Sequence, residues 1–202
     1  MVDLQIGGKT RSLVRDRVAR EGSLGRLVEF GCGTGFFTEV LARKADTLVA
    51  TDISPGMLKL AQQRVKAPHV TFTTEDCQHT SLLDGAFDTA FLSLVIHFTV
   101  PEDTVAEMHR ILRPEGVMIV VNLDPRALNG LDRIRSLLRI VYRGVSGYRI
   151  KPPRGFGRNV MTERELRELL GKSGFRVDSA ETIKDRSRSS NVPVEYVRAV
   201  KA

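Results

Sequence analysis

The sequence predicts an α/β fold: a seven-stranded, mostly parallel sheet with an antiparallel C-terminal hairpin and helices on both faces. Short apolar segments alternate with stretches of helical periodicity up to residue 123, which is typical of parallel β-α-β units. Glycines or acidic residues follow several of the strand-like segments. Two strand-like segments near residue 200 have no helix between them, which predicts an antiparallel pair.

Each element is expected from the spacing of its apolar residues. Residues 1–8 are expected to form a loose tail and residues 9–21 a short helix. Further helices are expected at 36–45, at 55–65 after the N-cap Ser54, from Pro101 to just before Pro114, and after the capping box that begins at Thr162. Strands are expected at 27–30, 47–50, 69–74, 87–95, 117–123, 175–183 and 192–200.

Length and composition fit one folded domain over residues 1–202. Hydrophobic residues make up 42% of the chain and charged residues 27%, a balance that excludes a disordered or fibrous protein. Two cysteines are too few for a disulfide framework or a zinc cluster, so no metal site is expected. There is no apolar run of membrane-spanning length and no secretory leader pattern, so we expect a cytoplasmic protein.

The positive charge is concentrated in one segment, residues 124–160. This segment holds nine Lys and Arg residues and two Asp residues, so its own net charge of +7 equals the net charge of the whole chain. Its apolar residues from Leu128 to Val145 fall at helical spacing, with most of its arginines off that stripe. We interpret it as a basic insertion before the last helix. It could be a cap over the sheet end, a contact for an anionic amphiphile or a membrane surface, or a nucleic-acid groove.

A glycine-rich loop, GCGTG at 31–35, joins the first expected strand to a helix. Such a loop lets the backbone approach a ligand closely, although a tight turn alone would need similar residues. It departs from the dinucleotide-binding pattern G-x-G-x-x-G, because the third glycine comes one residue early and Phe36 takes its place. Glu29 also precedes it, and a carboxylate there suits an ammonium group better than a pyrophosphate.

Two further acids follow expected strands. Asp52 ends the second strand, where a carboxylate can accept from both hydroxyls of a ribose or simply cap a helix. Asp76 and Cys77 lie just past the third strand. There the carboxylate could accept from an adenine amino group and the backbone could face the ring, or Asp76 could be an ordinary turn residue.

Together these segments resemble class I S-adenosylmethionine-dependent methyltransferases, which have a Rossmann-like sheet. The resemblance rests on four stretches in order: LVEFGCGTGFFTEVLA, ATDISPGML, EDCQHTSLLDGAFDTAFLSLVIHF and MHRILRPEGVMIVVN. It is nearest to the small-molecule group that includes ubiquinone/menaquinone and phospholipid methyltransferases. It implies S-adenosyl-L-methionine as the cofactor and methyl transfer to O, N or C of a small or amphiphilic acceptor.

The resemblance also implies a role for each matching residue. Glu29, Gly31 and Gly33, with Cys32 between the glycines, would face the methionine end, and Gly35 would support the turn. Asp52 would hold the ribose, with Ile53 and Met57 beside the adenine. Asp76 would accept from the adenine amino group, the Cys77 backbone would support the ring, and the Ser93 carbonyl would meet the ammonium.

His97 follows the fourth expected strand and is the candidate general base for an acceptor that arrives protonated. A buried structural histidine at a helix start is the alternative. Two other functions remain open: a nucleic-acid methyltransferase that uses 124–160, and a cofactor-binding regulatory protein without turnover. Sparse aromatic residues, at 6% of the chain, make nucleic acid an unlikely partner, and the sequence does not predict the oligomeric state.

Overall fold

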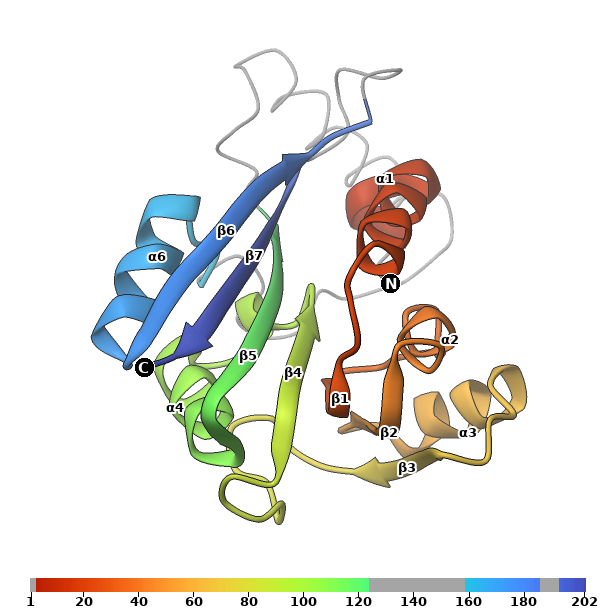
Figure 1. Ribbon diagram of the computed structural model, residues 1–202. Helices are drawn as coiled ribbons and strands as arrows, with labels where there is room; N and C mark the ends of the chain where they lie inside the picture. Colours follow the sequence, from red (N-terminus) through yellow and green to blue (C-terminus); the bar gives the residue numbers. More distant parts are fainter. Residues whose placement is uncertain (1–2, 124–158, 186–192) are drawn as a thin grey trace.

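The computed structural model describes residues 3–123, 159–185 and 193–202, with side chains from Lys9 onward. Its strands form one seven-stranded sheet in the order β3-β2-β1-β4-β5-β7-β6 (Figure 1). The strands are β1 (Gly25–Phe30), β2 (Ala45–Asp52), β3 (Val70–Thr74), β4 (Phe87–Ser93), β5 (Leu112–Leu123), β6 (Phe175–Ile183) and β7 (Val194–Lys201).

The pairing confirms the predicted sheet. Strand β1 pairs in parallel with β2 and β4, and the parallel part continues to β3 on one side and β5 on the other. Strand β7 runs antiparallel to both of its neighbours, β5 and β6. The C-terminal hairpin therefore closes the sheet with β7 on the inside and β6 at the edge.

Helices cover both faces of the sheet (Figure 1). One core layer packs under α1, α2 and α3, and includes Leu27, Leu48 and Phe91 from the sheet. The opposite layer packs under α4 and α6, and includes Phe30 and Leu92. The helices are α1 (Asp3–Ala19), α2 (Thr38–Leu41), α3 (Pro55–Arg64), α4 (Pro101–Ile111) and α6 (Glu163–Lys172), with a short 3-10 helix at Ile96–Phe98.

Two expectations for the N-terminal part were wrong. Helix α1 begins at Asp3, so most of the expected tail is helical, although Gly7 and Gly8 lower its intrinsic helix propensity. The helix expected over 36–45 is one turn long. Turns occupy 33–37 before it, and Ala45 already belongs to β2. Apolar spacing alone did not separate these turns from a helix.

Two further boundaries differ from expectation. Helix α4 ends at Ile111 and β5 starts at once, so Pro114 lies in the strand and does not terminate the helix. An irregular register accommodates it, because Phe87 pairs with Leu112 and Thr89 pairs with Val117. The described connection from β3 to β4, residues 75–86, contains no helix and so breaks the predicted alternation.

Both predicted helix caps are present. The Ser54 hydroxyl accepts from the Met57 N–H at the start of α3. At α6, the Thr162 hydroxyl accepts from the Glu165 N–H at 3.2 Å, and the Glu165 carboxylate accepts from the Thr162 N–H at 2.7 Å. The predicted basic helix of 124–160 lies almost wholly outside the described residues.

The α6 cap gives a stability prediction. Thr162→Ala leaves the Glu165 N–H without its acceptor, and we expect the free energy of unfolding to fall by about 1 kcal/mol. Thr162→Ser keeps the hydroxyl and is the matched control, with stability near that of the wild type. Urea unfolding followed by circular dichroism measures both, and equal loss in the two variants would contradict the capping role.

Candidate cofactor site at the switch point of the sheet

The switch point of the sheet lies between β1 and β4, because the strands that follow β1 in the sequence, β2 and β3, lie on one side of it and β4 and β5 lie on the other. The connection after β1 leads toward β2, whereas β4 continues on the other side toward β5. In open α/β sheets, ligands bind beyond the carboxyl ends of the strands at this switch point. Glu29 and Gly31 lie at this end of β1, and Ser93 lies at the end of β4.

The Asp52 carboxylate connects the glycine-rich loop to the start of α3. Its Oδ2 accepts from the Gly33 N–H at 2.9 Å, and its Oδ1 accepts from the Ser54 N–H at 2.9 Å. A carboxylate offers about four acceptor positions, so each oxygen can accept a further hydrogen bond. Asp52 therefore fixes the loop and still presents acceptors at the strand end.

The three glycines of the loop have different surroundings. All have positive φ angles of 55–78°, a region that side chains disfavour. A Cβ on Gly31 would lie 2.3 Å from Val95 Cγ2, and one on Gly35 would lie 3.1 Å from the Ala61 Cα. A Cβ on Gly33 would meet nothing within 4 Å. Protein packing thus explains Gly31 and Gly35, and the open approach to the backbone is at Gly33.

Glu29 is buried beneath this loop. It is 2% exposed, and its Oε2 accepts from the Thr38 hydroxyl at 2.6 Å. Burial raises the pKa of Glu29 to about 8; the Thr38 hydrogen bond opposes this shift, and the charge of Asp52 adds to it. Cys32, next to it in the loop, is also buried, and burial raises its thiol pKa well above the usual range. A cation arriving here would favour the ionised form of Glu29.

Apolar and polar groups flank Asp52 and Gly31. Ile53 and Met57 are 70% and 37% exposed at the head of α3, which is unusual for large apolar side chains and leaves them free to contact a ring. Across the switch point, the Ser93 hydroxyl is buried and has no hydrogen-bond partner among the described residues. An unsatisfied buried hydroxyl beside the loop fits a site completed by a polar ligand.

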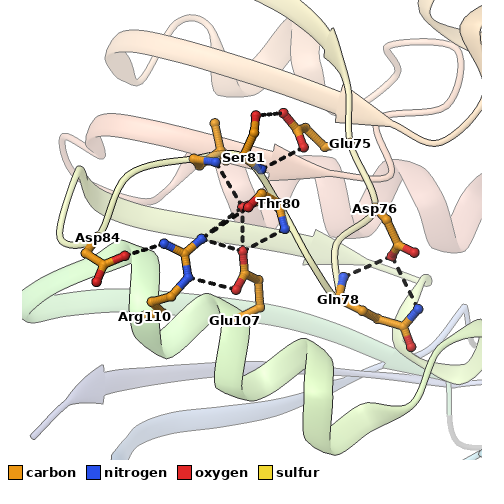
Figure 2. Close-up of polar contacts among 9 residues, drawn as sticks. Glu75, Asp76, Gln78, Thr80, Ser81, Asp84, Glu107 and Arg110 are labelled. Atoms are coloured by element: carbon orange, nitrogen blue, oxygen red, sulfur yellow. Dashed lines mark hydrogen bonds and ion pairs between the residues drawn. The ribbon is translucent and has the colours of Figure 1, made fainter.

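Asp76 and Cys77 follow β3, as predicted, but their side chains differ in solvent exposure. Asp76 is half-buried, and its Oδ1 accepts from the Gln78 backbone N–H at 3.0 Å and from the Gln78 side-chain amide at 3.3 Å (Figure 2). The Cys77 side chain packs in the core under α4. Burial raises the pKa of Cys77 to about 11, so its thiol stays protonated and only its backbone can serve a ligand.

A polar cluster that the sequence analysis missed holds this connection against α4 (Figure 2). Glu107 accepts from the Thr80 N–H at 2.8 Å and from the Thr80 hydroxyl at 2.5 Å, and Arg110 donates to Glu107 at 2.6 and 2.9 Å. Arg110 also pairs with Asp84. A glutamate among the inward positions of α4, three residues before an arginine, was the available sequence signal.

His97 lies in the 3-10 helix after β4 and is fully buried. Its ring centroid is 4.2 Å from that of Phe98. Burial lowers the pKa of His97 to about 4, so the ring is neutral near pH 7 and is a weak base.

Among the described residues, no group of three or more His, Cys, Asp or Glu could hold a metal ion. No helix of the described chain is long and apolar enough to cross a membrane.

Comparison with known proteins identifies the fold that carries this site. Residues 28–120 match the family model described as a methyltransferase domain. Over these residues the chain is similar to methyltransferases. It is 35% identical over 108 residues to a malonyl-[acyl-carrier protein] O-methyltransferase of Serratia marcescens, which covers 52% of this chain and 41% of that protein. The chain therefore spans less than half the length of this relative.

Solved structures share the fold over nearly the whole chain. An S-adenosylmethionine-dependent methyltransferase from Mesorhizobium loti superposes with a TM-score of 0.68 at 22% identity, covering 96% of this chain and 98% of that one. The [4+2]-cyclase SpnF superposes with a TM-score of 0.69 at 19% identity, covering 96% and 80%. The fold alone thus does not specify the reaction.

The buried Glu29 predicts how stability changes above pH 6.5. The native state keeps a proton on Glu29 up to about pH 8, whereas the unfolded chain loses it near pH 4.5. The contribution of Glu29 to the free energy of unfolding therefore falls as the pH rises between these values. His97 contributes the opposite slope below pH 6.5, so the net free energy of unfolding of the ligand-free protein should fall from about pH 6.5 to pH 8, by up to about 1.4 kcal/mol per pH unit. Glu29→Gln should remove this slope in denaturant unfolding at pH 6.5–8. The exposed Glu102→Gln should follow the wild type, and an equal slope in Glu29→Gln would contradict the assignment.

His97 predicts the opposite trend in acid. The unfolded chain protonates this ring near pH 6.5 and the native state only near pH 4, so the contribution of His97 to stability should fall as the pH decreases between these values, opposite in sign to that of Glu29. Replacing His97 with Asn should weaken this acid sensitivity in thermal melts at pH 4.5–6.5. Replacing the exposed His79 with Asn is the control, and identical acid profiles for both variants would exclude His97 as the source.

Proposed function

We propose that this protein transfers the methyl group of S-adenosyl-L-methionine to a small or amphiphilic molecule. The observation that carries the proposal is the geometry around Asp52. Its carboxylate holds the Gly33 and Ser54 N–H groups at the switch point, beside the part of the glycine-rich loop that is open to a ligand. The match of residues 28–120 to a methyltransferase domain supports the same conclusion.

The proposal gives each site residue a role along the length of the cofactor. Asp52 would accept from the ribose hydroxyls, and the exposed Ile53 and Met57 would contact the adenine ring. Asp76 would accept from the adenine amino group, with the Cys77 backbone at the ring edge. At the other end, the methionine portion would lie over Gly33, with Gly31 and Cys32 behind it and Gly35 supporting the turn.

The ammonium group would lie between Glu29 and Ser93. Glu29 is buried and carries a proton near neutral pH, so a cation beside it would promote loss of that proton. The Ser93 carbonyl can accept from the ammonium, and its buried hydroxyl offers a second polar group. Cofactor binding is therefore expected to release a proton from Glu29.

Bound S-adenosylmethionine supplies an electrophilic methyl group on a sulfonium, and the protein has to align an acceptor with it. His97 can accept a hydrogen bond or a proton because it is neutral near pH 7, but its low pKa makes it a weak general base. We therefore keep His97 as the candidate base only for an acceptor whose own proton is acidic. For other acceptors its contribution would be to packing beside Phe98.

The acceptor is proposed as a small or amphiphilic molecule with an O, N or C nucleophile. The Serratia relative is named for a malonyl group on a carrier protein, which favours an acidic or carrier-bound acceptor. The basic segment 124–160 would supply complementary charge and could contact an anionic membrane surface. The alternatives remain a nucleic-acid methyltransferase using this segment and a regulatory protein that binds the cofactor without turnover.

The role of Asp52 is tested by calorimetry with S-adenosylhomocysteine. Asp52→Ala should weaken binding by about 1.5–3 kcal/mol, because it removes charge-assisted hydrogen bonds to the ribose. Asp46→Ala, which removes an acid near the opposite end of β2, should bind like the wild type. NAD should not compete. Wild-type affinity in Asp52→Ala would refute this site.

A further inference from the structure

The side chain of Gln78 joins the segment after β3 to the start of α4. Its amide N–H donates to Asp76 Oδ1 at 3.3 Å, and its Oε1 accepts from the Val100 N–H at 2.8 Å, at the start of α4. The first segment follows β3 and the second follows β4, so Gln78 spans the gap between the ends of two strands that are not neighbours in the sheet.

Gln78 is held at both ends and cannot rotate without losing a bond. Rotation of its amide would place the N–H₂ group against the Val100 N–H and the carbonyl against the Asp76 carboxylate, and both contacts would be repulsive. The Val100 N–H therefore sets which end of the amide faces Asp76. The Val100 N–H at the start of α4 thus ensures that the Gln78 amide presents its N–H₂ group, and not its carbonyl, to Asp76.

The two hydrogen bonds from Gln78 determine the orientation of the Asp76 carboxylate. Both go to Oδ1, one from the backbone N–H and one from the side-chain amide. Among the described contacts, Oδ2 receives none, and Figure 2 shows it directed away from Gln78. The carboxylate is therefore oriented with one oxygen held by the protein and the other available as an acceptor.

The rest of the connection is fixed independently of Gln78. Thr80 is bound to Glu107 through both its N–H and its hydroxyl, and Ser81 is bound in the same way to Glu75 (Figure 2). The backbone on the C-terminal side of Gln78 is thus held against α4 by other residues. Loss of the Gln78 side chain would remove one of the two hydrogen bonds that hold Asp76 Oδ1 and would leave the Val100 N–H without its acceptor, while the bond from the Gln78 backbone N–H remains.

We propose that Gln78 is a positioning residue that directs Asp76 Oδ2 toward the 6-amino group of the adenine and so sets the selectivity of the site for that group. The proposal rests on the proposed cofactor. A free carboxylate can turn to other donors or to water, whereas one held through Oδ1 keeps its acceptor in one place. Recognition of the amino group then requires no movement of the acid when the ligand binds.

Selectivity is measured with two ligands that differ only in this group. They are S-adenosylhomocysteine and its analogue in which unsubstituted purine replaces adenine. The wild type should prefer the amino-bearing ligand by about tenfold, the value of one hydrogen bond to a charged acceptor. In Gln78→Ala the preference should fall to about threefold or less, mainly through weaker binding of S-adenosylhomocysteine.

A second variant keeps the test independent of folding defects. Gln78→Glu retains an acceptor for the Val100 N–H but replaces the donor to Asp76 with a carboxylate, so it should also lose the preference. Gln63→Ala, on the exposed side of α3, is the matched control and should keep it. Arg110→Ala removes hydrogen bonds that support residues 75–86 but contacts no atom of Asp76. It should therefore lower the melting temperature and weaken the binding of both ligands by the same factor.

The outcomes separate this proposal from the proposed function. Loss of preference in both Gln78 variants, with the preference retained in Arg110→Ala, supports the positioning role. If the wild type binds S-adenosylhomocysteine but does not distinguish the two ligands, or if the Gln78 variants keep the full preference, the positioning role is wrong and the cofactor site stands. If the wild type binds neither ligand, the proposed function itself fails.

Discussion

The pairing of β1 with β2 on one side and β4 on the other is the constraint on which the site depends. Strand β1 is the middle one of the five parallel strands, and four of its six residues are buried. The chain leaves its carboxyl end into the glycine-rich loop. That loop turns back to meet Asp52 at the end of β2, while the segment after β4 departs the other way. The candidate site residues Glu29, Asp52 and Ser93 lie at the carboxyl ends of these three strands.

Three carboxylates gather at this edge of the sheet, and the fold holds each of them differently. Asp52 accepts from two backbone N–H groups, Asp76 accepts from the backbone and side chain of Gln78, and Glu29 is buried with one hydroxyl partner. The first two stay accessible as acceptors, whereas Glu29 is the one whose charge depends on what binds beside it. This arrangement supports the proposed ligand, which has hydroxyl and amino donors along its length and a cation at one end.

The sequence was sufficient for the sheet, both helix caps and the acids at the strand ends, because these depend on local spacing and on the rule that parallel strands end at the same edge. It was insufficient where tertiary contacts decide. The turns before Thr38 have the same apolar spacing as a helix, but Gly33 and Gly35 adopt positive φ angles there, which a helix does not contain. Gln78 was missed because its partner Val100 is 22 residues away, and nothing local indicates that pairing. The depth at which His97 is buried likewise depends on elements distant in the sequence.

The position of β7 bears on the order in which the chain can fold. This strand is the last of the seven in sequence, yet it lies inside the sheet and supplies the partner for both β5 and β6. During synthesis, β6 has no strand to pair with until β7 has left the ribosome, and one edge of β5 stays open for the same interval. Strands β1 to β4, which include the strand before the glycine-rich loop, do not pair with β7 and can therefore form before it is synthesised. Exposed strand edges attract other chains. The nascent protein is thus most prone to aggregation in the interval between emergence of β5 and arrival of β7.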